Sequence, residues 1–160
     1  MNASRTATLT LPTDEQILVE REFDAPKHLV YRAFTEPDLV RRWWTANRGD
    51  MTAAEIDLRV GGTYRFAMVT PDGMEVAFRG EYHEIVPDER IVSTEVYEGA
   101  PGSEGTRNTL TLDESDGRTT VTILIDAGSK ETRDAILASG MEDGLQDALD
   151  LLDEVARSLA

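Results

Sequence analysis

The stretch at residues 129–158, SKETRDAILASGMEDGLQDALDLLDEVARS, decides the fold. Its apolar residues recur at steps of three and four, which is the spacing of one face of an α-helix. This apolar stripe consists of Leu137, Met141, Leu145, Ala148, Leu152, Val155 and Leu159. Acidic residues mostly occupy the opposite face, and Ser129 stands where an N-cap residue belongs. The pattern predicts one long amphipathic helix from Ser129 to Ser158, which needs a wide apolar surface to lie on.

Most of the chain before this helix has the period-2 alternation of β-strands. EQILVEREFD at residues 15–24 predicts the first strand. An Asp-Gly pair at residues 72–73 and another at residues 116–117 each separate two alternating runs, which is a strong hairpin signal. Between the first strand and these hairpins we expect two short helices, the second of them from Asp38 to Trp44, directly after a proline.

The order of these elements is typical of the α+β class, with an antiparallel sheet and segregated helices. A strongly curved sheet that grips the long helix would bury its apolar stripe. Such a sheet leaves a space between itself and the helix, and that space is either filled by side chains or hollow. We expect residues 1–14 to form a flexible tail and residues 15–160 to form one domain.

Composition excludes several classes of function. The 160 residues carry a net charge of −15, with 31 acidic residues against 16 basic ones. This argues against nucleic acid and anionic membranes as partners, because both bind clustered positive charge. The absence of cysteine excludes disulfides, thiolate zinc sites and cysteine nucleophiles. No apolar run has the length of a membrane span, and the first residues lack the apolar region of a signal peptide, so we expect a cytoplasmic protein.

Five segments in this order resemble the activator of heat-shock protein 90 ATPase homologue family. They are REFDAP at 21–26, YRAFTEPDLVRRWW at 31–44, DLRVGGTYRF at 57–66, GEYHEIVPDERIVST at 80–94 and SGMEDGLQDALDLLDE at 139–154. The resemblance covers Leu18 to Leu152. It implies the helix-grip fold of the START-like (SRPBCC) superfamily, in which a curved antiparallel sheet wraps a long C-terminal helix and an apolar cavity lies between them. The family's eukaryotic co-chaperone has an extra N-terminal domain for which this sequence has no room, so we do not expect a chaperone partner.

The two tryptophans of the chain are adjacent, at Trp43 and Trp44. Neighbouring residues on a helix point about 100° apart, so the two indoles cannot enter the same core. We expect one to pack under the sheet and the other to lie at the surface or at a cavity mouth. Two interpretations stay open: both are structural, or one walls a pocket and offers its indole N–H to a ligand.

The predicted sheet face is rich in aromatic residues and methionine, and it is either an ordinary core or the wall of an adaptable pocket. Gly140 and Gly144 lie within the predicted helix, where each costs roughly 1 kcal/mol relative to alanine. Either the sheet approaches closely there or the missing side chains leave cavity volume. The cavity candidates are Trp43, Trp44, Met51, Tyr64, Phe66, Met68, Val76, Phe78, Tyr82, Tyr97, Met141, Gly144 and Leu145.

Six charged strand residues are the plausible polar anchors of such a pocket, but we expect them to form cross-strand ion pairs on the solvent side instead. They are Asp57, Arg59, Arg65, Arg79, Glu81 and Glu95. The two histidines, His28 and His83, lie in no spacing typical of a metal site or a catalytic triad. We therefore expect no catalytic residue, metal or cofactor.

The leading hypothesis is a non-enzymatic protein that binds a small hydrophobic molecule in the cavity between sheet and helix. The first alternative is a cyclase- or hydrolase-like enzyme, which needs a buried ionisable group in that cavity with a shifted pKa. The second is a protein-interaction module, with a possible homodimer, that uses an exposed apolar patch near the tryptophans.

Overall fold

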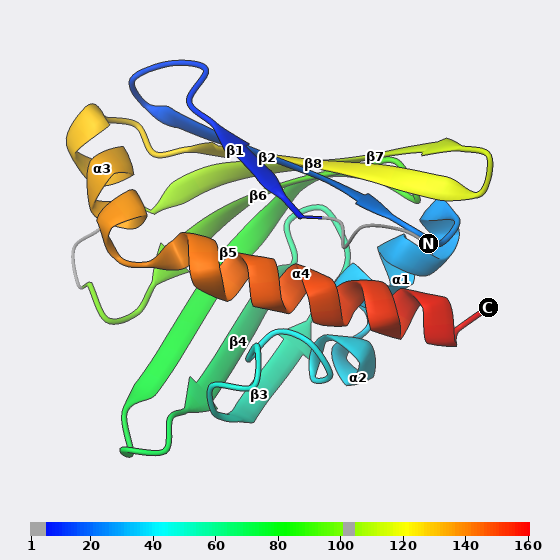
Figure 1. The fold of residues 1–160 in the computed structure, drawn as a ribbon. Helices are drawn as coiled ribbons and strands as arrows, with labels where there is room; N and C mark the ends of the chain where they lie inside the picture. The colour runs from blue at the N-terminus through cyan, green and yellow to red at the C-terminus, as the bar shows by residue number, and fades with distance from the viewer. Residues whose placement is uncertain (1–5, 101–104) are drawn as a thin grey trace.

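Eight antiparallel strands form one curved sheet, and helix α4 (Met141–Ser158) crosses its concave face in a computed structural model of the chain (Figure 1). The structure describes residues 6–100 and 105–160. The strands are β1 Thr8–Thr10, β2 Gln16–Phe23, β3 Asp50–Ile56, β4 Thr63–Val69, β5 Glu75–Val86, β6 Arg90–Tyr97, β7 Thr106–Ser115 and β8 Arg118–Asp126. The other helices are α1 Lys27–Thr35, α2 Pro37–Val40 and α3 Lys130–Ala138. The strand order β1-β2-β8-β7-β6-β5-β4-β3 confirms the predicted α+β class, with its antiparallel sheet around a C-terminal helix.

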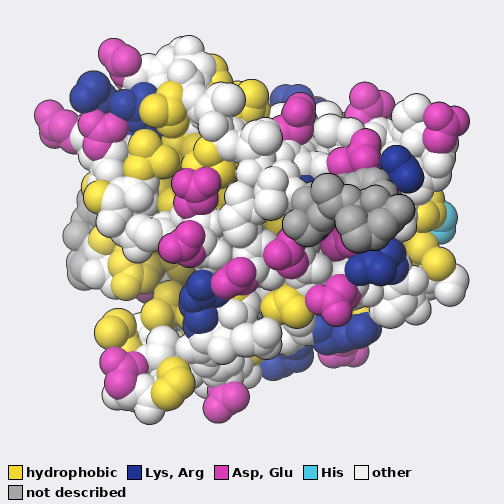
Figure 2. Space-filling model, viewed as in Figure 1, with side chains coloured by type: hydrophobic (Ala, Val, Ile, Leu, Met, Phe, Trp, Pro, Cys, Tyr) yellow, Lys and Arg dark blue, Asp and Glu magenta, His cyan; other side chains and the backbone are white. Residues whose placement is uncertain are grey.

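Helix α4 has the two faces that its sequence predicts. Its inner face is buried and includes Leu149, Leu152 and Val155. Its outer face is exposed and includes Asp143 and Asp150. Acidic side chains are spread over the face of the molecule that carries α4 (Figure 2). In the described part of the chain, no helix is long and apolar enough to cross a membrane.

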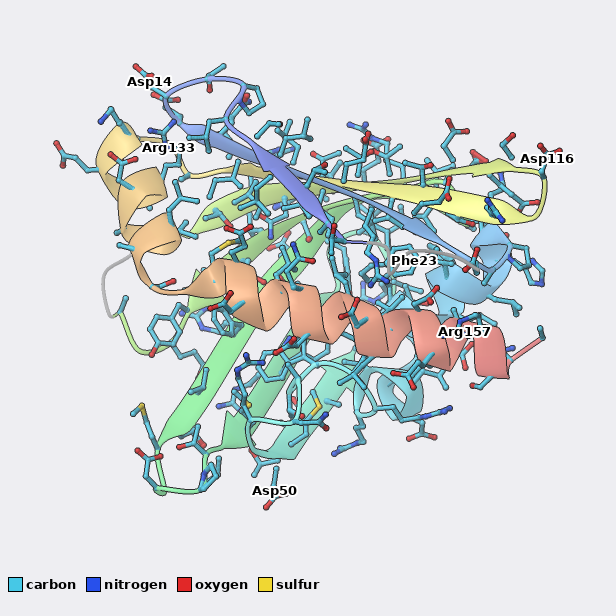
Figure 3. The ribbon with its side chains drawn as sticks, viewed as in Figure 1. Asp14, Phe23, Asp50, Asp116, Arg133 and Arg157 are labelled. Carbon is cyan, nitrogen blue, oxygen red and sulfur yellow. The ribbon has the colours of Figure 1, made fainter. Side chains whose placement is uncertain are left out.

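Both predicted hairpins are present. Strands β7 and β8 turn at Asp116 and Gly117, whose φ angles of 55° and 77° are those of a tight hairpin turn. Asp116 lies at the tip of this hairpin (Figure 3). Strands β4 and β5 join through residues 70–74, and their register places Phe66 opposite Phe78. The two phenylalanines therefore share a face of the sheet, as the alternation predicts.

A filled core lies between α4 and the part of the sheet around β2. Ile17, Val19 and Phe23 alternate along β2 and are at most 1% exposed. They belong to one buried cluster with Leu149 and Leu152 of α4. Burial of each such side chain contributes about 1.5–3 kcal/mol. This part of the molecule therefore anchors the helix to the sheet and leaves the remaining concave face to the cavity.

The prediction of a single helix from Ser129 to Ser158 is wrong, because the chain breaks into α3 and α4 at Gly140. This residue has a φ of 82°, in the left-handed region that ends α-helical geometry and that favours glycine. Gly140 is thus the N-cap of α4, and only Gly144 lies inside a helix. The predicted cap of the first segment is confirmed, since the Thr132 N–H donates to Ser129 Oγ at 3.1 Å.

Two shorter segments also differ from expectation. The tail expected at residues 1–14 includes strand β1, which pairs with β2, while residues 1–5 lie outside the described residues. Helix α2 ends at Val40 and does not continue to Trp44. Tighter turns follow it, in which the Trp43 N–H donates to the Val40 carbonyl at 3.2 Å, three residues back.

Candidate functional site, a cavity under helix α4

A cavity of about 430 Å³ lies between α4, the sheet and the loop at residues 41–49. Most of the predicted cavity residues line it: Trp43, Trp44, Tyr64, Phe66, Met68, Val76, Phe78, Tyr82, Met141, Gly144 and Leu145. Hydrophobic side chains reach the surface beside α3 and the first turns of α4, on the left of Figure 2. The cavity thus lies next to the filled core, under the part of α4 that follows the break at Gly140.

Two of the predicted cavity residues are not among those that line it. Met51 lies on β3 next to Met68, one strand further towards the edge of the sheet. Tyr97 is 39% exposed, and its ring packs against that of Phe78 with centroids 5.1 Å apart. Tyr97 therefore supports the wall residue Phe78 from outside the cavity.

The adjacent tryptophans have different environments. Trp43 is 9% exposed, and its indole Nε1 donates to the Ala33 carbonyl oxygen at 2.8 Å. That bond ties the loop to helix α1 and occupies the N–H, so Trp43 has a structural role even though its ring borders the cavity. The ring of Trp44 instead packs against two phenylalanines of the sheet. Its centroid lies 5.8 Å from that of Phe66 and 6.0 Å from that of Phe78.

Tyr64 forms the floor of the cavity, and Gly80 makes its position possible. The Tyr64 hydroxyl donates to the Thr94 carbonyl oxygen at 2.7 Å, across strand β5. A Cβ on Gly80 would lie 1.9 Å from that same oxygen and 2.6 Å from the Tyr64 ring. Burial raises the pKa of Tyr64 because the phenolate would lose its hydration, so the group stays a neutral phenol.

Gly144 leaves part of the helix wall empty. A Cβ built on Gly144 would meet no heavy atom within 4 Å. Close approach of the sheet therefore does not explain this glycine, and of the two explanations left open by the sequence, cavity volume is the one that fits. Helix-interior glycine still costs roughly 1 kcal/mol relative to alanine.

The loop at residues 41–49 closes one side of the cavity. Arg48 bridges from this loop to Asp147 on α4 with an N–O distance of 2.8 Å. Both side chains are largely exposed, so the ion pair contributes at most about 1 kcal/mol. Ala46, which borders the cavity, and Asn47 have φ angles of 51° and 61°. This left-handed backbone is strained for alanine, and it turns the loop back towards α4.

Glu95 lies on the sheet wall of the cavity, and the prediction that it forms an ion pair on the solvent side is wrong. Ile91, Ser93 and Glu95 alternate along β6 and all line the cavity. The prediction is confirmed for Arg65, which pairs with Glu98 at 2.9 Å on the other face of the sheet.

Burial raises the pKa of Glu95, because the surrounding protein removes water from the carboxylate. The side chain is partly exposed, and it borders the hollow. The Asn108 amide opposes this rise as a hydrogen-bond donor. Thr106 Oγ1 donates to Asn108 Oδ1 at 2.8 Å, which leaves the amide N–H₂ group for Glu95. These groups form a small polar area on an otherwise mostly apolar wall.

Sequence reasoning named Glu95 as a possible polar anchor but favoured the solvent side for it, because alternation defines two faces of a strand without saying which one is internal. Val92, Thr94 and Val96 form the more apolar set on β6 and favour the opposite assignment. The sequence did contain one signal for the inward position of Glu95. Residues two apart on a strand point to the same face, so a cavity position for Tyr97 implies that Glu95 also faces the cavity. His83 is exposed on β5, and within residues 6–100 and 105–160 no cluster of acidic or histidine side chains is arranged to hold a metal ion.

Comparison with known proteins identifies the family. The family model for Activator of Hsp90 ATPase homolog 1-like proteins matches residues 24–157. The chain belongs to this family. The resemblance seen in the sequence is thereby confirmed, and so is the helix-grip fold that it implies. No curated protein matches the chain.

Solved structures of bacterial proteins share the fold of this chain. A crystal structure of a Rhodobacter sphaeroides protein is 25% identical with a TM-score of 0.87, covering 96% of this chain and 99% of that one. A Chromobacterium violaceum protein is 30% identical with a TM-score of 0.75, covering 88% and 96%. An AHSA1-like protein from Aeromonas hydrophila is 22% identical with a TM-score of 0.68, covering 90% and 93%.

Proposed function

We propose that this chain binds a small, mostly apolar molecule in the cavity between the sheet and α4. The observation that carries the proposal is the hollow at Gly144, where the helix omits a side chain opposite an aromatic wall. The cavity volume of about 430 Å³ falls within the range of small-molecule sites, roughly 300–1,000 Å³.

Affinity would come from apolar burial and orientation from a few polar groups. Each Å² of apolar ligand surface removed from water contributes about 25 cal/mol. The rings of Trp44, Phe66 and Phe78 offer flat apolar surface, while Met68 and Met141 adapt to ligand shape. Glu95 and Asn108 are the polar groups that would set ligand orientation.

An acid–base enzyme is the second candidate, and Glu95 is the observation that favours it. The enzyme hypothesis required a buried ionisable group in the cavity, and the raised pKa of Glu95 meets that requirement. Catalysis predicts that a bound molecule is converted with a pH-dependent rate and that Glu95→Gln abolishes the conversion. Simple binding predicts that the molecule is released unchanged.

The binding proposal is tested with N-phenyl-1-naphthylamine, a neutral probe whose fluorescence increases in apolar surroundings. We expect saturable binding to the wild-type protein and loss of binding in Gly144→Leu, whose side chain would occupy the hollow. Glu154→Leu places the same residue on the exposed side of α4 and is the matched control. Native mass spectrometry of freshly purified protein would show any co-purified small molecule.

Two results would contradict the binding proposal. One is no saturable probe binding by the folded wild-type protein, and the other is equal binding by wild type and Gly144→Leu. In either case the interaction-module alternative gains weight, and sedimentation analysis for a homodimer becomes the next measurement.

A further inference from the structure

Glu95 is an acidic group in a wall of aromatic rings. Among the cavity-lining side chains in the described part of the chain, it is the sole carboxylate. Its side chain borders the hollow, and the surrounding protein removes water from its carboxyl. A hydrophobic core gains nothing from a carboxylate there, because desolvation penalises the charge.

In the described part of the chain, no basic side chain pairs with this carboxylate. Within residues 6–100 and 105–160, no charged neighbour affects the pKa of Glu95, and the Asn108 amide is the hydrogen-bonding side chain beside it. The basic residue that borders the cavity, Arg48, is exposed and pairs with Asp147 at 2.8 Å. The cavity therefore presents a carboxylate whose natural complement is a cation brought by the ligand.

The remaining walls also suit a cation. Trp44, Phe66 and Tyr64 present rings around the hollow, with the centroids of Trp44 and Phe66 5.8 Å apart and those of Tyr64 and Phe66 5.2 Å apart. Aromatic faces attract ammonium groups through their quadrupole, most strongly when water is excluded. The net charge of −15 adds a field over the whole surface that draws cations and repels anions.

We propose that the ligand of this cavity is an organic amine, whose apolar body lies against the aromatic rings and whose ammonium group pairs with Glu95. The inference rests on the proposed binding function and assigns the ligand class. It excludes fatty acids and other carboxylates as preferred ligands, since two carboxylates would meet in a desolvated site.

The test compares two probes with one apolar body, 1-naphthylmethylamine and 1-naphthalenemethanol. At neutral pH the first is a cation and the second is neutral. Isothermal titration calorimetry should show that the wild-type protein binds the amine at least about tenfold more tightly than the alcohol. This factor corresponds to one additional charge-assisted hydrogen bond, between the ammonium group and Glu95. Glu95→Gln should remove this preference, because the ammonium group of the amine loses its charged partner. Glu81→Gln, an exposed position on β5, should behave as wild type.

Equal affinity of the wild-type protein for the two probes would overturn the proposal, and so would an unchanged preference in Glu95→Gln. The wild-type comparison decides the matter by itself if Glu95→Gln fails to fold. Binding of neutral N-phenyl-1-naphthylamine without any binding of the amine refutes the ligand class and leaves the cavity function standing. Failure of all three probes refutes the cavity function.

Discussion

Alanine at Gly144 and alanine at Gly140 should change stability in opposite directions. The added methyl group meets no heavy atom within 4 Å at either position, so steric clash is absent from both variants. The difference lies in the backbone. Gly144 is inside α4, whereas Gly140 has a φ of 82°.

At Gly144 the alanine gains helix propensity of about 0.8–1.0 kcal/mol. At Gly140 the left-handed backbone costs an alanine about 1–2 kcal/mol, and the reduced freedom of the unfolded chain offsets roughly 0.4–1 kcal/mol of that. We therefore expect Gly144→Ala to stabilise by about 1 kcal/mol and Gly140→Ala to destabilise by about 0.5–1 kcal/mol. For a chain of this size each kcal/mol shifts the melting temperature by about 2–4 °C.

Thermal unfolding followed by circular dichroism, supported by urea titration, measures both effects. Destabilisation by Gly144→Ala would mean that the space beside the helix is occupied, which removes the main argument for a hollow. A stabilising Gly140→Ala would mean that the helix is continuous through this residue, as the sequence pattern alone suggested.

Two further substitutions separate structural from functional roles at the cavity wall. Trp43→Phe should lower the free energy of unfolding in urea by about 1–3 kcal/mol, because the buried Ala33 carbonyl loses its hydrogen-bond donor. Trp44→Phe should lower it by less. Equal losses would show that the Trp43 hydrogen bond does not stabilise the fold. The folded-state pKa of Glu95 is raised, so its contribution to stability is complete below the unfolded pKa of about 4.3 and is lost as pH rises through the folded pKa. At neutral pH, the urea midpoint of Glu95→Gln should therefore be higher than that of the wild-type protein. The gap between the two midpoints should shrink towards about pH 4. A gap that does not change with pH would show that Glu95 is not desolvated.

The elements that sequence predicted well are those whose periodicity is strong and local. Period-2 alternation placed Phe66 and Phe78 on one face because side-chain direction in a strand follows directly from spacing. Apolar residues at steps of three and four likewise predicted the buried face of α4. The cavity wall followed from the same two periodicities, which is why most of its aromatic members were predicted.

The features that sequence did not predict depend on contacts between distant segments. The helical pattern continues across Gly140, and nothing local distinguishes a helix-interior glycine from one that ends the helix. Whether Glu95 or Val96 faces inward depends on how β6 is placed between β5 and β7, which spacing within β6 does not encode. Sequence predicted different environments for the two tryptophans, but it did not say which of them is the buried one. That depends on the Ala33 carbonyl of the neighbouring helix, which accepts from Trp43.

Three features that reduce stability meet at one cavity, and their coincidence favours a binding function over packing alone. Gly144 costs helix propensity, Glu95 costs desolvation, and Ala46 holds a left-handed backbone with a φ of 51°. A single substitution at any of them, such as alanine at Gly144 or glycine at Ala46, would relieve its cost without disturbing the filled core under β2. Strain and buried charge of this kind persist where function requires them. A core that served only to hold α4 against the sheet would have no use for a gap, a desolvated acidic group and a strained loop around the same 430 Å³.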